Sequence, residues 1–251
     1  MTTRIVIPAR LQSSRLAEKV LLPIHGRSML EWVWRRAVAS DVGEVVVATD
    51  HPRIVDVVEG FGGTVMLTSA EHVSGGDRVA EVARRAGWDT ADRVINLQAD
   101  EPQMPAACLR QLARLSDEHD DAVASLYQPL DNITQLNDSS VVKVVCDVHG
   151  RALYFSRAAI PWRRDSTAQS DSNLAAYRRH LGLYAYPVEL LLRWSQLPPS
   201  PCEQVEKLEQ LRMLEHGIPI VLAAAAEAVP AGIDTAEDWQ RVVADWDAYY
   251  S

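Results

Sequence analysis

The chain has 251 residues and a formal net charge of -9, with apolar and charged fractions that are ordinary for a folded protein. This length is compatible with one compact α/β enzyme domain. The acidic balance excludes a general nucleic-acid-binding role, because phosphate contacts need a basic surface. Any anion that the chain binds must therefore meet a local cluster of cations.

Cysteine usage and hydropathy indicate a soluble cytoplasmic protein. The cysteines Cys108, Cys146 and Cys202 are odd in number and widely spaced, so they fit neither a zinc pattern nor a disulfide framework. Residues 1–10 hold a short apolar strand and no signal-peptide hydrophobic region. The longest uncharged apolar stretch, residues 218–226, is far too short to span a bilayer. We expect reduced thiols and neither a membrane nor a nucleic-acid partner.

Strand-like and helix-like segments alternate through the first half of the chain. Strands are predicted at 4–8, 44–49, 64–68 and 93–97, and helices at 28–39, 52–61, 77–86 and 105–118. The strands are continuous apolar runs, whereas the helices carry apolar residues at helical spacing. This order is typical of a parallel sheet covered by helices on both faces.

The second half has a different pattern. Strands are predicted at 122–127, 141–147, 152–156 and 181–186, without long helices between them, which indicates an antiparallel or mixed extension of the sheet. The polar residues 165–175 predict a loop. Two helices close the chain. One begins with a capping box from Ser200 to Glu203 and ends at Gly217, and the other begins near Asp234 and Thr235.

Three cations follow the first predicted strand. Arg10, Arg15 and Lys19 fall within ten residues of one another. Ligands of open α/β sheets bind beyond the carboxyl ends of strands, so this segment suits a polyphosphate. A solvated surface loop is an equal alternative on this segment alone. The segment is neither a Walker loop nor a GxGxxG fingerprint, which argues against a P-loop ATPase and a standard dinucleotide site.

Carboxylates mark two further segments. Asp100 and Glu101 follow the strand at 93–97 and precede Pro102. Magnesium prefers a few carboxylates together with phosphate oxygens and water. Taken alone, this pair is better explained as a polar turn. Asp234 is likewise explained by a helix N-cap until other evidence is added.

Other polar segments suit a small anionic ligand. Ser74 to Arg78 form a glycine turn that opens a helix, where backbone N–H groups can approach a ligand. Arginines beside tight turns, Arg157 and Arg164, suit a carboxylate substrate. His180 is more often an orienting residue than a base.

An ordered set of motifs runs through nearly the whole chain, from Ile7 to Trp239. Its members are Pro8-Ala9-Arg10 with Ser14-Arg15-Leu16, Val47-Ala48-Thr49-Asp50, Asn96 with Gln98 and Asp100-Glu101-Pro102, Val142-Lys143-Val144-Val145, Leu153-Tyr154-Phe155-Ser156-Arg157 with Ile160-Pro161-Trp162, His180-Leu181-Gly182, Leu208-Glu209-Gln210-Leu211-Arg212, and Asp234-Thr235 with Glu237-Asp238. Each motif is weak alone, but the ordered set is highly specific. It resembles the 3-deoxy-manno-octulosonate (Kdo) cytidylyltransferase family.

The resemblance implies a fold and a reaction. The fold is an α/β, Rossmann-like nucleotidyltransferase (GT-A-like) mixed sheet flanked by helices, forming a single domain over residues 1–251. A smaller mixed-sheet extension at about 122–200 would bind the acceptor and form a homodimer. The enzyme would join CTP to Kdo with Mg²⁺, giving CMP-Kdo and pyrophosphate for lipopolysaccharide biosynthesis.

The resemblance also implies roles for individual residues. The nucleotide would contact Pro8, Ala9, Arg10, Arg15, Lys19, Ser74, Gly75, Arg78 and Gln98. The acceptor acid would contact Gln98, Arg157, Arg164, His180, Tyr184, Glu209 and Gln210. Magnesium would be held by Asp100 and Asp234, and Arg10, Lys19 and Asp100 would be the catalytic residues.

Several positions depart from the family pattern. Ala17-Glu18 stand where Pro-Gly usually precedes the phosphate-binding lysine, which should weaken the attraction for phosphate beside Lys19. Ala99 replaces a glycine and would be strained at positive φ. Gly76 stands where threonine is usual. These departures leave other acceptors open, such as 8-amino-Kdo or a phosphonate, and also a catalytically silent nucleotide-binding module on the same fold.

Overall fold

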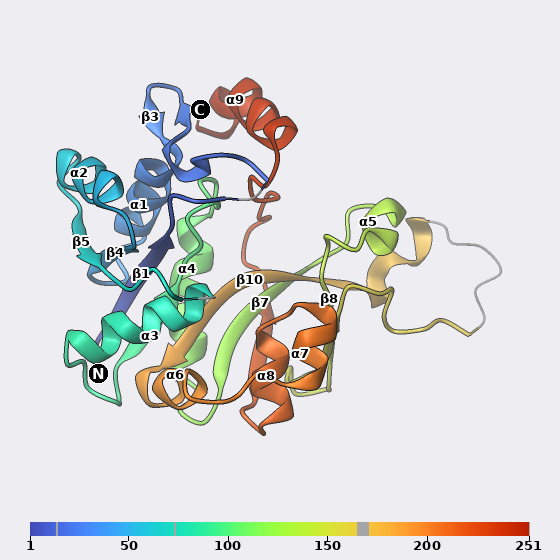
Figure 1. Cartoon of the computed structure of the whole chain (residues 1–251). Helices are drawn as coiled ribbons and strands as arrows, with labels where there is room; N and C mark the ends of the chain where they lie inside the picture. Colours follow the sequence, from blue (N-terminus) through green and yellow to red (C-terminus); the bar gives the residue numbers. More distant parts are fainter. Residues whose placement is uncertain (14, 73, 165–170, 251) are drawn as a thin grey trace.

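The computed structural model describes residues 1–13, 15–72, 74–164 and 171–250 (Figure 1). The strands are β1 (Thr3–Ala9), β2 (Pro23–Ile24), β3 (Arg27–Ser28), β4 (Val45–Thr49), β5 (Thr64–Leu67), β6 (Arg93–Asn96), β7 (Val123–Pro129), β8 (Lys143–Cys146), β9 (Ala152–Ser156), β10 (Arg178–Pro187) and β11 (Ile220–Ala224). The helices are α1 (Met29–Ala39), α2 (Pro52–Gly60), α3 (Gly75–Arg85), α4 (Ala106–Asp117), α5 (Ile133–Asn137), α6 (Val188–Trp194), α7 (Pro201–Glu206), α8 (Gln210–Glu215) and α9 (Ala236–Tyr250), with short 3-10 helices η1 (Lys19–Leu21) and η2 (Asp171–Ala176). Within these residues, no helix combines the length and the apolar character needed to cross a membrane.

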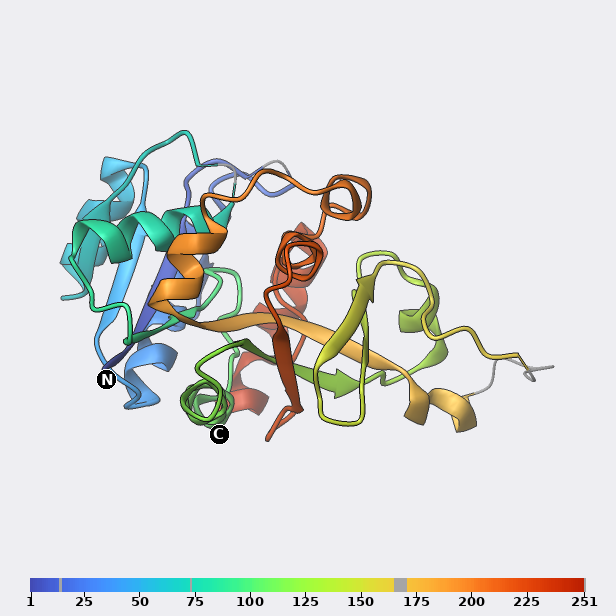
Figure 2. The same cartoon turned by 90° about the horizontal axis from the view of Figure 1, so that it is seen from below.

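The strands of the described residues form a nine-stranded mixed sheet and a small hairpin of β2 and β3. Seven strands of the large sheet are hydrogen-bonded in the order β11-β7-β10-β6-β1-β4-β5. β1 lies parallel to β4 and β6, whereas β10 runs antiparallel to both β6 and β7. β8 and β9 form an antiparallel arm on β10, which Figure 2 shows at the end of the molecule away from the N-terminal strands. The predicted fold class, a parallel first half with a mixed extension, is confirmed.

The first predicted helices and strands are confirmed, with small changes at their ends. The prediction that α3 begins at Asp77 is wrong by one half-turn. The helix begins at Gly75, because the Ser74 hydroxyl caps it by accepting a 3.1 Å hydrogen bond from the Asp77 N–H. Glycine therefore occupies the first turn of the helix, where the backbone lies close to the end of β1.

The single helix predicted from Ser200 to Gly217 is wrong. The capping box at Ser200 and Glu203 is present, but α7 ends at Glu206 because Lys207 adopts the left-handed conformation, with φ of 56°. The N–H of Lys207 bonds to the Glu203 carbonyl, and the chain restarts as α8 at Gln210. The break places Glu209 and Gln210 at the start of a separate helix.

Three other elements of the second half were not predicted from the sequence. The apolar residues 218–226 include a strand, β11, that pairs parallel with β7. The short helices α5 and α6 were also not predicted. The loop predicted at 165–175 lies in part outside the described residues, at 165–170, and its later part overlaps η2.

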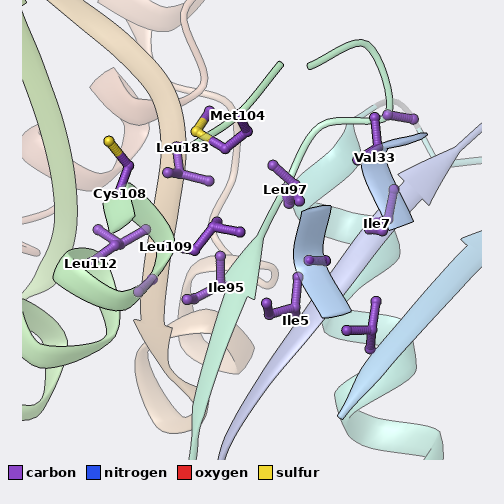
Figure 3. Close-up of a cluster of buried hydrophobic side chains, with 14 of the residues drawn as sticks. Ile5, Ile7, Val33, Ile95, Leu97, Met104, Cys108, Leu109, Leu112 and Leu183 are labelled. Atoms are coloured by element: carbon purple, nitrogen blue, oxygen red, sulfur yellow. The ribbon is translucent and has the colours of Figure 1, made fainter. Parts of the chain in front are cut away.

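The two faces of the sheet carry different helices. Ile5 and Ile7 of β1 point to one side, where α1, α2 and α4 supply Val33, Ile54 and Leu109. Figure 3 shows this cluster, in which residues of α4 pack against Ile95 and Leu97. Alternation along a strand sends neighbouring side chains to opposite faces. On the opposite face, residues of α3, α6 and α8 form a second cluster with Val6.

The last helix packs on the hairpin of β2 and β3. Trp246 and Val242 of α9 bury against Ile24 and Met29, and Ile233, just before the helix, joins the same cluster. Figure 1 shows α9 beside β3, although the two are distant in sequence. This packing brings the segment before α9 next to the loop that follows β1.

Gly76 and Trp194 fit together at the contact between α3 and α6. A Cβ atom at Gly76 would overlap two ring carbons of Trp194, whose side chain is buried. Trp194 also stacks on Tyr186 and lies beneath the Arg212 guanidinium. The space that threonine would fill in the resembled family is therefore occupied by the indole ring.

We predict that Gly76→Ala lowers the free energy of unfolding by about 1–3 kcal/mol, because the added methyl group overpacks the contact with Trp194. Adding Trp194→Leu to that variant should recover part of the loss. The matched control is Gly60→Ala in α2, where no atom lies within 4 Å of the new Cβ. Equal denaturation midpoints for the Gly76 and Gly60 variants would show that the indole does not restrict this position.

Candidate active site

The parallel strands end along one edge of the sheet. Ala9, the last residue of β1, pairs with Thr49 at the end of β4, and Val6 pairs with Asn96 at the end of β6. The loops after β1 and β6 therefore leave the sheet side by side. In open α/β sheets, this edge is where ligands bind. The predicted cations Arg10, Arg15 and Lys19 lie on the loop after β1, and Asp100 and Glu101 lie on the loop after β6.

The two predicted metal ligands meet at this edge. The Ile233 N–H donates a 3.0 Å hydrogen bond to the Asp100 carbonyl, which joins the segment before α9 to the loop after β6. The Lys19 ammonium then donates to both carboxylates, at 2.7 Å to Asp100 and 3.0 Å to Asp234. Arg15 donates to the same oxygen of Asp234 at 2.8 Å. Two carboxylates from distant segments thus share one lysine.

Gly232 lets the segment before α9 come close to the loop after β6. A Cβ atom there would lie 2.8 Å from a carboxyl oxygen of Glu101 and 3.3 Å from the Asp100 carbonyl oxygen. Such distances are shorter than ordinary van der Waals contacts, so a side chain would push the two segments apart. Gly232 was not selected from the sequence as a site residue, although it opens the segment from Gly232 to Asp238 that contains Asp234.

Thr235 and Asp238 cap α9, which leaves the Asp234 carboxylate outside the cap. The Thr235 hydroxyl accepts from the Asp238 N–H at 3.2 Å, and Asp238 accepts in return from the Thr235 N–H at 3.0 Å. This reciprocal pair satisfies the N–H of Thr235, just before the helix, and that of Asp238, its third residue. The alternative that Asp234 serves merely as the N-cap is therefore not needed. Its carboxylate faces Lys19 and Arg15 instead.

Opposing effects act on the charges around this cluster. Burial by itself would lower the pKa of Lys19, but Asp100 and Asp234 outweigh it, so the pKa is raised and the lysine stays an ammonium. Removal of the Glu101 carboxyl from water, together with the Asp100 charge, raises its pKa to about 8. Glu101 therefore carries a proton at neutral pH, which limits the negative charge beside Asp100.

Two adjoining cavities meet at these residues. The larger cavity, of about 610 Å³, is lined by Gln98, His180, Tyr184, Glu209 and Gln210 among others. The smaller, of about 170 Å³, is lined by Pro8, Arg10 and Lys19 among others. Both are bordered by Arg15, Gln98, Asp100 and Asp234. The larger cavity is sized for a small ligand.

Three other predicted nucleotide residues, Ala9, Ser74 and Gly75, lie beside residues that line the smaller cavity. Ala9 is buried in the core at the end of β1. Gly75 brings the start of α3 against Pro8 and Gln98, where a Cβ would lie 3.3 and 3.4 Å from their atoms. Ser74 caps α3, as described above.

Arg78 has a structural environment. It is buried and donates to Asp50 at 2.8 Å and to the Thr68 hydroxyl at 2.6 Å. These bonds tie α3 to the segments that follow β4 and β5. Arg78 does not line either of the two cavities among the described residues.

The structure does not bring Arg157 and Arg164 to the larger cavity. The Arg157 guanidinium donates at 2.8 Å to the carbonyls of Glu206 and of Ser139, so it links β9 to the end of α7. Arg164 is exposed and directly precedes the undescribed residues 165–170. Their roles toward an acceptor remain predictions. Arg179 and Lys207, which the sequence analysis did not select, line that cavity instead.

Two departures from the family pattern have local explanations. Ala99 is buried among apolar residues of the core and is not among the residues at positive φ, so its methyl group causes no backbone strain. Glu18 does adopt positive φ, at 49°, where a glycine would be relaxed. Its carboxylate pairs with both terminal nitrogens of Arg53 on α2. This charge is thus compensated by Arg53 rather than directed at Lys19.

Comparison with known proteins identifies the family of this chain. A family model described as cytidylyltransferase matches residues 4–220. The chain belongs to the cytidylyltransferase family. Its relatives include the 3-deoxy-manno-octulosonate cytidylyltransferases of Saccharophagus degradans, 46% identical over 95% of this chain and 96% of the relative, and of Methylococcus capsulatus, 48% identical over 94% of each. This cytidylyltransferase is therefore a CTP-dependent nucleotidyltransferase.

Solved structures agree with the fold. A CMP:2-keto-3-deoxy-manno-octonic acid synthetase complexed with CTP matches this cytidylyltransferase with a TM-score of 0.90 and 39% identity, over 99% of both chains. A cytidylyltransferase from Leptospira borgpetersenii matches over 100% of this chain and 89% of its own, with a TM-score of 0.65 and 16% identity. The second likeness supports the fold alone.

The donor set of the site fits magnesium. Among the described residues no group of three or more His, Cys, Asp or Glu side chains is placed to hold a metal. Mg²⁺, however, is usually bound by one or two carboxylates together with substrate phosphates and water. Asp100 and Asp234 already converge on one cation, the Lys19 ammonium. Their oxygens therefore suit a divalent ion that is shared with a triphosphate.

His180 lies at the base of the larger cavity as a neutral orienting residue. It is 7% exposed, shares a 3.0 Å hydrogen bond with the Ser125 hydroxyl and packs edge-on against Phe155. Burial, aided by the neighbouring charge of Arg179, lowers its pKa to about 3. The imidazole is therefore uncharged across the working pH range. Its ring also packs beside that of Tyr184, which it helps to position.

We predict that His180 makes the fold less stable as the pH falls below about 6.5, the ordinary pKa of histidine. The unfolded chain then binds a proton that the folded chain refuses until the pH approaches 3. The loss is at most about 1.4 kcal/mol per pH unit. His180→Gln should therefore show a shallower decline of unfolding free energy between pH 6.5 and 4.5 in denaturant titrations. The exposed His149→Gln is the control, and identical slopes for the wild type and His180→Gln would contradict this account.

Proposed function

We propose that this chain transfers CMP from CTP to the anomeric hydroxyl of Kdo, giving CMP-Kdo and pyrophosphate. The observation that carries the proposal is the border shared by the two cavities, which contains Gln98, Asp100 and Asp234. A transfer reaction needs a donor and an acceptor that meet at one point. The names of the relatives, Kdo cytidylyltransferases of nearly equal length, support this acceptor.

The smaller cavity suits the triphosphate. Arg10 is exposed on its lining, and Lys19 and Arg15 lie at its border with the aspartates. In a chain of net charge -9, this is a local concentration of positive charge. Arginine and lysine both form charge-assisted hydrogen bonds with phosphate oxygens. These side chains would hold the phosphates at the point where pyrophosphate leaves.

The larger cavity suits a polyhydroxylated acid. Tyr184, Gln98 and Gln210 offer hydrogen-bonding groups to hydroxyls, and Glu209 offers a carboxylate. Arg179 and Lys207 line the same cavity and offer positive charge to the acid group. The carboxylate of Kdo would therefore find cations there, while its sugar hydroxyls would face the hydrogen-bonding side chains of Tyr184, Gln98 and Gln210.

The proposed mechanism depends on orientation and charge. The acceptor hydroxyl held in the larger cavity loses its proton to solvent while its oxygen attacks the α-phosphorus in line. The bond from that phosphorus to the bridging oxygen breaks, and pyrophosphate departs toward Arg10 and Lys19. Mg²⁺, bound through Asp100 and Asp234, would supply Lewis-acid stabilisation of the charge on phosphate oxygens. The chain itself contributes positioning and fixed positive charge, which are the main requirements of phosphoryl-group transfers.

We also propose the cellular setting that this acceptor implies. The enzyme would act in the cytoplasm in lipopolysaccharide biosynthesis, as a homodimer formed through the second-half extension. The arm of β8 and β9 supports this arrangement, because Leu153 and Tyr154 of β9 expose 60% and 36% of their surfaces. An exposed apolar side chain is removed from water when a partner chain covers it, which favours association.

A direct test measures pyrophosphate release from CTP with a panel of acceptors: Kdo, 8-amino-Kdo, sialic acid and simple phosphonates. We expect Mg²⁺-dependent turnover that is fastest with Kdo. Asp100→Asn, assayed beside the wild type, should lower kcat/KM by at least about a hundredfold, because it removes a charge-assisted contact to the transferring group. Its thermal unfolding should remain cooperative.

Two outcomes would contradict the proposal. A higher kcat/KM with another acid than with Kdo would reassign the acceptor while retaining the reaction class. Turnover of Asp100→Asn close to that of the wild type would remove the proposed role of the aspartate pair.

A further inference from the structure

Lys19 bridges the two aspartates from a protected position. Its side chain is 11% exposed, and its ammonium bonds to Asp100 at 2.7 Å and to Asp234 at 3.0 Å. Lys19 opens the short helix η1, whose next residue, Val20, is buried in the core. The lysine is thus anchored at its backbone, while its long side chain spans the two carboxylates.

The ammonium and a divalent ion would compete for the same oxygens. A magnesium ion needs about 2.0–2.1 Å to each ligand oxygen. The Lys19 ammonium already occupies the space in front of Asp100 Oδ2 and Asp234 Oδ1. Two cations on the same pair of oxygens would also repel each other. One has to leave before the other can bind both carboxylates.

The smaller cavity offers the lysine a second set of partners. Lys19 lines this cavity together with Arg10 and Gln12. A lysine side chain has four rotatable methylene groups, so its ammonium can move a few ångströms while the backbone stays fixed. Triphosphate oxygens placed in the cavity would attract it away from the carboxylates.

We propose that Lys19 is an internal counter-cation of the aspartate pair, which it holds until a triphosphate draws the ammonium away and opens both carboxylates to the metal. This inference rests on the proposed function for the identity of the triphosphate. It assigns Lys19 a second role besides gripping phosphate. In the absence of nucleotide, Lys19 keeps the two aspartates paired and ordered. The divalent ion then binds tightly only when the triphosphate is also bound.

Arg15 has a smaller share in the same role. Of the two aspartates it contacts only Asp234 among the described ion pairs, and its side chain is 61% exposed. An exposed ion pair is weak, because water screens it and the long side chain loses freedom. Lys207 provides a contrast, since it lines the larger cavity and forms no ion pair with either aspartate among the described contacts. The three residues therefore form a graded series.

The test is a Mn²⁺ titration of the nucleotide-free protein, in which electron paramagnetic resonance counts the free ion. Lys19→Met should bind Mn²⁺ at least about tenfold more tightly than the wild type, because the competing charge is gone. Arg15→Met should bind only slightly more tightly, and Lys207→Met should bind like the wild type. In calorimetry with CTP and no divalent ion, Lys19→Met should bind the nucleotide more weakly than the wild type.

Thermal unfolding provides a second measurement on the same variants. Lys19→Met should unfold at a lower temperature than the wild type without metal, because two carboxylates lose their shared partner. It should gain more from added Mn²⁺ than the wild type does, since a ligand stabilises the fold in proportion to its occupancy. Lys19→Gln, with a neutral polar side chain, replaces the Met variant if that variant does not fold.

The contrary result is specific to this inference. Equal or weaker Mn²⁺ binding by Lys19→Met and Lys19→Gln, compared with the wild type, would overturn the counter-cation role. The titration uses neither CTP nor an acceptor. Failure of CMP transfer to Kdo would therefore leave its outcome unchanged, and the two failures can be told apart.

Discussion

One backbone hydrogen bond, from the Ile233 N–H to the Asp100 carbonyl, holds the candidate site together. It joins the loop after a central strand to the segment before the last helix, and Gly232 lets the two backbones approach. Packing of α9 on the hairpin of β2 and β3 fixes the second segment in place. This contact helps to keep Asp100 and Asp234 together at the border that the two cavities share.

The carboxyl groups around this contact are compensated by neighbouring cations or by a proton. Lys19 and Arg15 neutralise the aspartate pair, and Glu101 is held in its protonated form by its surroundings. At the neighbouring strand ends, Arg78 pairs with Asp50. Each carboxyl at this edge thus has a partner or a proton. The smaller cavity consequently keeps Arg10 available for an anion.

Sequence patterns predict the parallel half of the fold well, because its strands are continuous apolar runs separated by amphipathic helices. They fail where a single backbone conformation decides the outcome. Lys207 in the left-handed region divides one predicted helix into two, and no residue pattern around it indicates that break. The strand β11 was missed although Ile220 and Val221 favour strands, because it is only five residues long and runs into alanines, which favour strands less.

The candidate site was predictable only in part for a related reason. Local sequence alone identifies Asp100 as a turn residue and Asp234 as a residue before a helix. Their place in an ordered set of motifs is what predicts that they bind a metal. Arg157 and Arg78 could be placed only by the structure, which gives both arginines partners within the fold. Arg179 sits beside the selected His180 motif and Glu101 lies within the selected Asp100 motif, but their contribution depends on the pairing of β10 with β6, which no local pattern fixes.

The central claim is that the two aspartates act as one unit at the junction of the cavities. A double-mutant cycle on kcat/KM for Asp100→Asn and Asp234→Asn measures this directly, once melting curves show that all variants fold. Residues that serve one shared ion should be strongly non-additive, so the double variant should be no more than about threefold slower than the slower single variant. Losses that multiply across the two substitutions would mean that the aspartates act independently, which would contradict the account.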